Sequence, residues 1–386
     1  MIKKTLRIDE LDDTIQLGRG IRERRTQLDL TQAELAEGVG FRAPQTVSDI
    51  ERGRREVKAW ELVRIARTLR TTSDDLLGLE PAWKARVLWR RGSSAGSRAT
   101  EEMFLDRARR YALLEKWNRL PPAATLPEYK LDPARASFND AARLARELGR
   151  TLDLGSRPAA SLQTVLQEVF RVKLFFDDLG DDESAAAAKG AFGCAVLMNA
   201  AQAPWRRNYN LAHELFHLVT WETTVEEGAG EGEESQWLDH VEKLANAFAS
   251  HLLLPADEAS SQFEVRFPAG EIGYPDLVEM AREFEVSTEA LVWRLKWLGK
   301  LSEGRAEEIL ADPDFRRADR RTMHRHWVPA PEGPLPARYW RLALGAYVRG
   351  EVSLAKTARM LEVSVSEAGE LLLAGDDERE AAASAT

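Results

Sequence analysis

The chain has 386 residues, a length typical of two or three domains, and a formal net charge of −9. Hydrophobic residues make up 44% and charged residues 30%, the composition of a soluble globular protein. The single cysteine, Cys194, excludes internal disulfides and a cysteine-based zinc knuckle. The sequence contains neither a signal-peptide pattern nor an apolar run near the roughly 18 residues of a membrane span, so we expect a cytoplasmic protein that does not contact membranes.

The first pattern along the chain is typical of a helix-turn-helix. Thr31 followed three residues later by Glu34 is a capping box, which predicts a helix starting at Thr31. Gly40 suits the turn that follows, and a short second helix is expected over residues 45–51 with Val47 and Ile50 facing inward. The outward positions of this helix, which could reach base edges, are Gln45, Thr46, Ser48 and Asp49.

This run resembles the XRE-type helix-turn-helix of phage repressors, including Ile-Glu-Arg-Gly at 50–53 and the apolar pattern at 60–69. The resemblance implies binding to double-stranded DNA, often as a homodimer on two half-sites. Residues 18–70 carry 12 Lys and Arg against 8 Asp and Glu, a local net charge of +4 that suits phosphate contacts. An alternative is that the unit binds protein. The predicted DNA-binding residues are Thr31, Gln32, Gln45, Thr46, Ser48, Asp49, Arg52 and Arg54.

The composition then changes. Residues 92–97 read Gly-Ser-Ser-Ala-Gly-Ser, a flexible linker by composition. A helix is expected over residues 101–119, with Phe104, Ala108, Tyr111, Leu114 and Trp117 on one stripe, and prolines after it mark an extended connection. We therefore predict a helix-turn-helix domain over 1–91 and a linker with a helix over 92–135.

The most specific motif is Leu-Ala-His-Glu-Leu-Phe-His-Leu at 211–218. His213 and His217 are four residues apart, so on a helix they project from one face and can share a metal ion. Glu214 lies beside that face, where it can act as general base on a metal-bound water, which is the H-E-x-x-H signature of zinc peptidases. The leucines at 211, 215 and 218 give the helix an apolar stripe, as expected for a helix buried beside a sheet.

A catalytic zinc site usually has three protein ligands, so a carboxylate on a second helix is expected. Residues 236–254 form that helix by their apolar spacing, and Pro255 ends it. Its acidic candidates are Asp239 and Glu242. We favour Glu242, because Asn246 lies one turn further on and could hydrogen-bond a zinc-binding histidine.

These residues together resemble the ImmA/IrrE metallopeptidases. The resemblance rests on Asn199, on Arg206 to Glu214, and on Glu242-x-x-Ala-Asn-x-Phe-Ala ending in Leu-Leu-Leu-Pro at 252–255, and it covers roughly residues 136–300. It implies Zn²⁺ held by His213, His217 and Glu242, with Glu214 as the base and a repressor or antitoxin as protein substrate. Asn210 stands where Thr is usual, and Phe216 stands where Gly is usual.

The remaining chain carries weaker signals. Residues 172–176 read as β-structure, and residues 191–198 predict a strand that is either the substrate-pairing edge of a sheet or an ordinary core strand. Residues 222–234 are rich in glutamate, either as a solvated loop or as a surface that favours basic substrates. After a proline-rich break, a last unit shows a faint second helix-turn-helix pattern, which we interpret as a packing or dimerisation unit.

The predicted fold is mainly α, with a small α+β zincin-like peptidase core over 136–312, an all-α N-terminal domain and a small helical domain over 335–376. Three functions fit. The first is a DNA-binding regulator with an active zinc endopeptidase. The second is a transcriptional regulator whose peptidase-like domain serves only sensing or dimerisation, and the third is an antitoxin-like binding protein. The complete set of metal ligands and base favours the enzyme.

Overall fold

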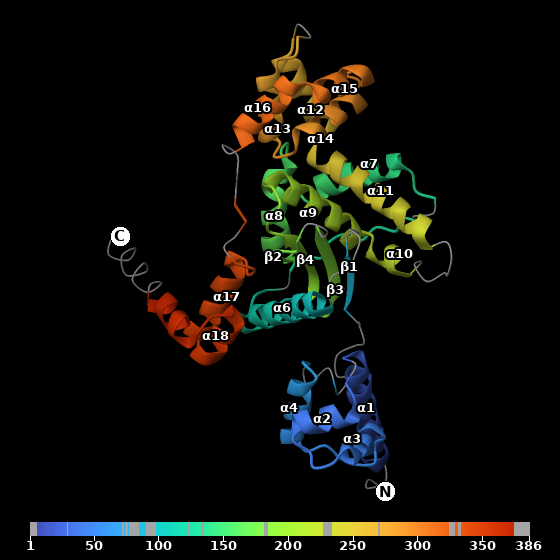
Figure 1. The fold of residues 1–386 in the computed structure, drawn as a ribbon, viewed down its shortest axis with the longest axis vertical. Helices are drawn as coiled ribbons and strands as arrows, with labels where there is room; N and C mark the ends of the chain where they lie inside the picture. The colour runs from blue at the N-terminus through green and yellow to red at the C-terminus, as the bar shows by residue number, and fades with distance from the viewer. Residues whose placement is uncertain are drawn as a thin grey trace. The chain divides into compact units, whose positions relative to one another are not determined.

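A computed structural model describes residues 6–373 apart from residues 29, 72, 74–75, 77–84, 90–97, 122, 133–134, 181–183, 227–233, 269–270, 324–328 and 331–332. The chain divides into two compact units, residues 1–84 and residues 85–386 (Figure 1). Within the described part, no helix has the length and apolar character needed to cross a membrane. The predicted linker at 92–97 and most of the glutamate-rich loop lie outside the described residues.

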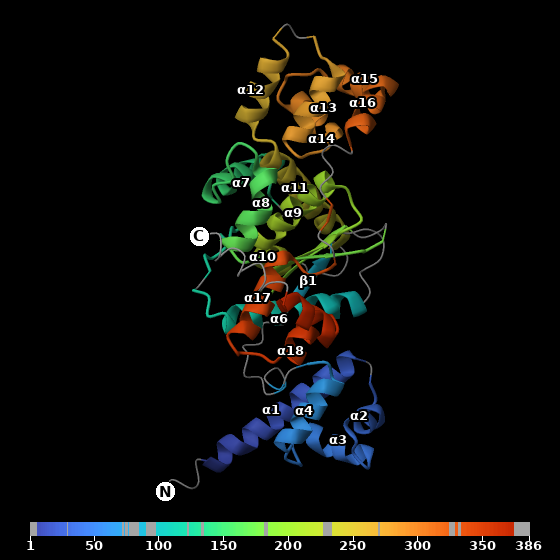
Figure 2. The ribbon, with the colours of Figure 1, turned by 90° about the vertical axis from the view of Figure 1, so that its left-hand side faces the viewer.

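Figure 2 shows the helices of the first unit, which pack around a small apolar core. They are α1 (Leu6–Gln27), α2 (Gln32–Val39), α3 (Pro44–Glu51) and α4 (Ala59–Thr68). The predicted capping box is present, with Thr31 as the N-cap of α2, and Gly40 ends that helix at φ 84°, a left-handed conformation that glycine adopts without strain. The core includes Ile21, Leu35, Val47, Ile50 and Ile65.

The second unit is built on a four-stranded sheet of described residues in the order β1-β3-β4-β2. Its strands are β1 (Arg86–Trp89), β2 (Lys173–Asp177), β3 (Ala185–Gly190) and β4 (Gly193–Asn199). β4 pairs in parallel with β2 and antiparallel with β3, which in turn pairs antiparallel with β1. Because β4 lies between two strands, the prediction that it is the substrate-pairing edge is wrong, and the alternative of a core strand is confirmed.

One face of the sheet faces a group of helices that includes the two with the H-E-x-x-H motif and Glu242. α9 (Pro204–Val219) packs directly on β3 and β4, and α11 (Glu234–Leu253) packs on α9. α7 (Phe138–Thr151) packs on α11, α8 (Pro158–Glu168) packs on α9, and the short α10 (Trp221–Glu226) follows α9. Alternate residues of the strands, including Leu174, Phe176, Val196 and Met198, face this layer. A cap of further helices follows α11, namely α12 (Ala256–Arg266), α13 (Tyr274–Glu283), α14 (Thr288–Trp297), α15 (Glu303–Ala311) and α16 (Pro313–Met323).

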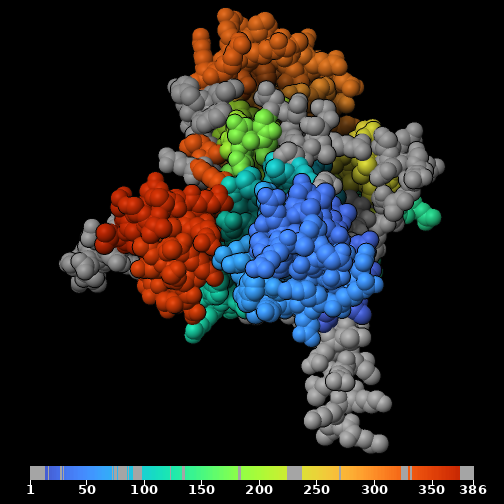
Figure 3. All heavy atoms as spheres, turned by 60° about the horizontal axis from the view of Figure 1, so that its bottom comes forward, coloured from blue at the N-terminus to red at the C-terminus, as the bar shows by residue number. Residues whose placement is uncertain are grey.

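The other face is covered by helices from two distant parts of the chain. They are α6 (Arg98–Trp117), α17 (Ala337–Val348) and α18 (Leu354–Leu361), whose apolar side chains share a core with Phe175, Ala195 and Leu197 of the strands. Figure 3 shows the C-terminal helices (red) against α6 (teal). Residues 92–135 were predicted to be a linker with a helix, but that helix, α6, packs on the sheet and is part of the core of the second unit. The helices of the predicted C-terminal unit, α17 and α18, pack on the same core.

A buried arginine ties these parts together. Arg107 of α6 is 5% exposed, and its guanidinium lies 2.8 Å from Asp177 at the end of β2 and 2.8 Å from Glu362 after α18. Both carboxylates accept hydrogen bonds from it, so the charge that α6 buries is compensated. The C-terminal helices are thus fixed to the sheet by a charged contact as well as by apolar packing.

Candidate functional site

The approach to α9 is held by polar contacts to backbone groups. Asn199 ends β4, as its place in the motif predicts, and its side chain donates to the Gly180 carbonyl and accepts from the Ala201 amide at 2.7 and 3.0 Å. Arg207, 8% exposed, donates to the Gln202 carbonyl at 2.9 Å. These bonds fix the turn between the strand and the helix, and Pro204 begins the helix at a position where its missing N–H costs nothing.

α9 buries its metal motif. His213 and Glu214 are 0% exposed and His217 is 4% exposed, while the leucines around them pack into the core of the unit. Polar side chains are rarely buried so completely unless they are paired or bind a ligand. The apolar stripe of α9 that was predicted from the sequence is therefore the face that packs in the core beside the sheet.

The second helix brings a carboxylate to the two histidines. The Nε2 atoms of His213 and His217 are 3.2 Å apart, and Glu242 on α11 places one carboxylate oxygen 3.2 Å from the first and the other 3.3 Å from the second. Among the described residues these three side chains form the group that could hold a metal ion. The Asp239 carboxylate, the alternative considered from the sequence, is not in this group, and that residue is exposed.

The triangle has the size that zinc requires. Donor atoms about 2.0–2.2 Å from a tetrahedral zinc ion are separated from one another by roughly 3.3–3.5 Å. The three contacts here, 3.2, 3.2 and 3.3 Å, are close to that spacing, and the two histidines contact different oxygens of Glu242. Two imidazoles and one carboxylate are also a common donor set for catalytic zinc, and the fourth position is left for water. The Glu242 side chain is 24% exposed, so the group is reached from solvent on that side.

The electrostatics of Glu242 follow from the same contacts. Burial would raise the pKa of its carboxyl, but hydrogen bonds with His213 and His217 hold that pKa far below its usual range. The carboxylate is therefore ionised at neutral pH. An anionic oxygen among imidazole nitrogens is the state that a divalent cation binds.

The ring of His213 is oriented by a hydrogen bond on the side opposite the contact with Glu242. Its Nδ1 lies 3.1 Å from Oδ1 of Asn246, one turn beyond Glu242 on α11. An amide oxygen only accepts, so Nδ1 of His213 donates to it, and Nε2 is the ring nitrogen left to bind a metal ion in place of its contact with Glu242. Tyr209 extends this contact, since its hydroxyl lies 3.1 Å from the same amide oxygen. The position of Asn246 follows the prediction, whereas the contact of Tyr209 was not predicted, although its spacing of four from His213 places it one turn away on the same face.

The two residues that depart from the family pattern have clear surroundings. Phe216, where glycine is usual, is 1% exposed and packs behind the motif against Phe248, with ring centroids 5.5 Å apart. Asn210, where threonine is usual, is 3% exposed and donates to the side-chain oxygen of Gln202 at 2.5 Å. Neither side chain enters the triangle.

The predicted DNA-contacting residues lie on α2, α3 and the loop after α3. Gln45 is exposed, Thr46 and Asp49 are partly exposed, and Gln45 donates to Asp49 at 3.0 Å. Arg52 and Arg54 are exposed beyond the end of α3, and Thr31 is exposed at the start of α2. Gln32 is partly buried, since it donates to Glu51, which also pairs with Arg25 at 2.6 Å.

The prediction that Ser48 faces outward is wrong. Ser48 is 6% exposed and lies on the inner face of α3 beside Val47 and Glu51, which are also buried. Residues three and four apart share one side of a helix, so positions 47, 48 and 51 turn inward together. A polar residue at the edge of an apolar stripe cannot be placed from polarity alone.

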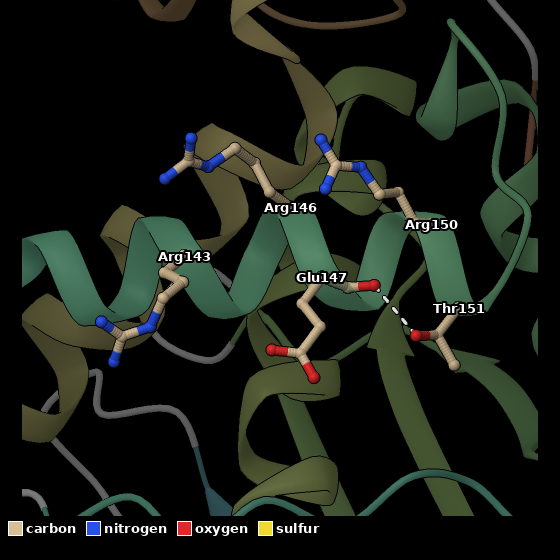
Figure 4. A pocket seen from close by; sticks show the side chains of 5 residues that line it. All are labelled: Arg143, Arg146, Glu147, Arg150 and Thr151. Atoms are coloured by element: carbon tan, nitrogen blue, oxygen red, sulfur yellow. Dashed lines mark hydrogen bonds between the residues drawn. The ribbon is translucent and has the colours of Figure 1, made fainter.

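A separate hollow of about 320 Å³ lies along α7 (Figure 4). It is lined by Arg143, Arg146, Glu147, Arg150 and Thr151, and the Thr151 hydroxyl donates to the Glu147 carbonyl at 3.0 Å. None of His213, His217 and Glu242 lines it. This hollow is therefore distinct from the candidate metal site.

Two protein-family models match the chain. Residues 21–76 match the model described as helix-turn-helix, and residues 167–296 match the peptidase-family model described as IrrE N-terminal-like domain. The first range contains the exposed residues of α3, and the second contains His213, His217 and Glu242. No curated protein matches the chain. The chain thus carries an XRE-type helix-turn-helix domain and, after it, a domain of the IrrE/ImmA-like metallopeptidase family.

Proposed function

We propose that this protein is a DNA-binding regulator whose second unit is a zinc-dependent endopeptidase. The observation that carries the proposal is the grouping of His213, His217 and Glu242, whose contacts of 3.2–3.3 Å are close to the donor spacing of a tetrahedral zinc site. Glu214 follows the first histidine in the order that zinc peptidases use. The family matches to a helix-turn-helix and to an IrrE-like domain support both halves of the proposal.

In the proposed mechanism, His213, His217 and Glu242 hold Zn²⁺. Zinc held there would supply a water of lowered pKa and a Lewis acid for a peptide carbonyl. Glu214 takes a proton from the attacking water and passes it to the leaving amine. Asn246 keeps the His213 ring oriented throughout, because its amide oxygen accepts from Nδ1.

The substrate class we propose is another DNA-binding regulator, a repressor or antitoxin, processed in the cytoplasm where the helix-turn-helix domain finds DNA. Gln45, which is exposed, and Thr46 and Asp49, which are partly exposed, would reach base edges from α3, as a recognition helix does. Arg52 and Arg54, with Thr31 and Gln32, would contact phosphates. A homodimer on two half-sites is the arrangement to test for this domain.

Zinc content tests the metal site first. Elemental analysis of protein purified without added metal is expected to give about one zinc per chain, because three protein ligands suffice for a catalytic site. Glu242→Gln should lose most of this zinc, whereas Asp239→Asn, on the same helix but outside the triangle, should keep it. If wild-type protein still contained no zinc after reconstitution, the proposed zinc-dependent peptidase activity would be refuted.

Glu214→Gln then separates an enzyme from a sensing module. This variant should keep zinc and lose cleavage by 10²-fold or more, since it removes the general base. Cleavage can be followed as loss of full-length repressor- or antitoxin-type proteins in cells that express the wild type or the variant. Equal behaviour of the two in a regulatory assay would instead support a non-catalytic role of this unit.

A further inference from the structure

The hydroxyl of Tyr209 makes a contact that the proposed mechanism does not use. Tyr209 lies on α9 one turn before His213, and its side chain is partly buried against the core of the unit. The hydroxyl oxygen is 3.1 Å from Oδ1 of Asn246 and 3.1 Å from the backbone carbonyl of the same residue. Both atoms only accept hydrogen bonds, so the phenol is the donor.

The single phenol hydrogen is shared between these two acceptors, so Oδ1 of Asn246 lies within hydrogen-bond distance of two donors. Oδ1 of Asn246 faces the Tyr209 hydroxyl and Nδ1 of His213, each at 3.1 Å. An amide oxygen has two lone pairs, so it can accept from both donors at once. The three side chains form a chain of contacts that begins at the phenol and ends at the ring whose Nε2 lies 3.2 Å from Glu242 and 3.2 Å from His217.

We infer that Tyr209 is a positioning residue for the metal site, acting through Asn246. This inference rests on the proposed zinc site. If the Asn246 side chain turned over, its NH₂ group would face His213, and the proton would move from Nδ1 to Nε2, where it blocks metal binding. A hydrogen bond from the phenol holds the carbonyl end of the amide toward His213 and disfavours that turn. Groups that orient metal ligands in this way affect metal affinity without touching the ion.

Tyr209→Phe tests this role, because it removes one hydroxyl and keeps the ring that packs in the core. Zinc affinity is measured by competition with a chelator of known affinity, a readout that does not depend on cleavage. Loss of a direct orienting partner typically costs 10–100-fold in metal affinity, so Asn246→Ala is expected in that range and Tyr209→Phe at about 3–10-fold.

A matched control exists in the same unit. The Tyr274 hydroxyl donates to Asp312 at 2.7 Å, away from the metal-binding group. Tyr274→Phe removes a hydroxyl and a hydrogen bond of the same kind, so it should lower the melting temperature of the metal-free protein and leave zinc affinity unchanged. If both tyrosine variants changed zinc affinity equally, the effect would be general destabilisation and the inference would fail.

A double-mutant cycle shows whether Tyr209 acts through Asn246. Adding Tyr209→Phe to Asn246→Ala should cause no further loss of zinc affinity, because the group through which the phenol acts is gone. Additive losses would overturn the inference, as would an unchanged affinity in Tyr209→Phe alone. A wild-type protein that binds no zinc would instead refute the proposed function, so the two failures are distinguishable.

Discussion

At the scale of single residues, the metal group shows how much chemistry local spacing encodes. His213 and His217 are brought together by the helix itself, so their proximity follows from a separation of four. Glu242 comes from another helix, and spacing alone left it in competition with Asp239. The packing of α9 on α11 separates these two acids, since only Glu242 reaches the histidines.

Phe216 gives a residue-scale prediction about stability. Its ring is 1% exposed and packs against Phe248, so it fills core volume that a glycine at this position would not occupy. Phe216→Ala is expected to lower the free energy of unfolding by about 3–5 kcal/mol, through lost apolar contact and a residual cavity. Urea unfolding of the metal-free protein measures this change. Phe138→Ala, at a ring that is 53% exposed, should cost far less, and equal costs would contradict the packing assigned to Phe216.

At the scale of helices and strands, the sequence was most informative where contacts are local. The capping box at Thr31, the strand that ends at Asn199 and the two motif helices depend on neighbouring residues, and all are present. β3 was not predicted, because its run of four alanines has no alternation and its pairing partners are distant. Ser48 was misplaced for a related reason, since the packing of α3 against α1 and α2, which are not its sequence neighbours on the helix, decides which edge of its apolar stripe is buried.

The start of α4 gives an element-scale prediction about pH. Glu61 accepts from Arg55 at 2.8 and 3.2 Å and from the Lys58 amide at 3.0 Å. The hydrogen bonds from Arg55 lower the pKa of Glu61 despite burial, so the ionised form is favoured in the folded state. This stabilisation is complete above the pKa of the unfolded chain, near 4.5, and is lost as the pH falls through the lower folded value.

We therefore expect Glu61→Gln to cost about 1 kcal/mol at pH 7 and progressively less as the pH falls below 4. Urea unfolding of the full chain, following the transition of the first unit at several pH values, measures this difference. Glu37→Gln, at an exposed position of α2, serves as the control. A difference between wild type and Glu61→Gln that grew on acidification would have the wrong sign for this account.

At the scale of the whole molecule, charge is unevenly distributed. The chain has a net charge of −9, yet residues 18–70 carry a net charge of +4. The net negative charge of the chain opposes DNA binding, so we expect any DNA contact to be made through the locally positive residues of the first unit. Arg52 and Arg54 are exposed at the end of α3, where phosphate contacts are expected.

Arg52→Ala and Arg54→Ala are each expected to reduce the slope of log affinity against log salt concentration by about 1, as loss of one phosphate contact does. Affinity should fall by similar factors for specific and unrelated DNA, which a fluorescence titration over a range of salt concentrations measures. Arg19→Ala removes an arginine that pairs with Glu23 at 3.3 Å and should leave the slope unchanged. An unaltered slope in both test variants would argue that this face does not meet the phosphates.

The face of the sheet that is covered by α6, α17 and α18 determines how short a fragment of this chain can fold alone. Residues 167–296, the stretch that family comparison recognises, lack α6 and α17, which pack on Phe175, Ala195 and Leu197. They also lack α7, which packs on α11. A fragment trimmed to the recognisable stretch would present a broad apolar surface to water and self-associate. The smallest part of the second unit that can fold alone is therefore larger than residues 167–296, so recombination could transfer it intact only together with the flanking segments that supply α6, α7 and α17.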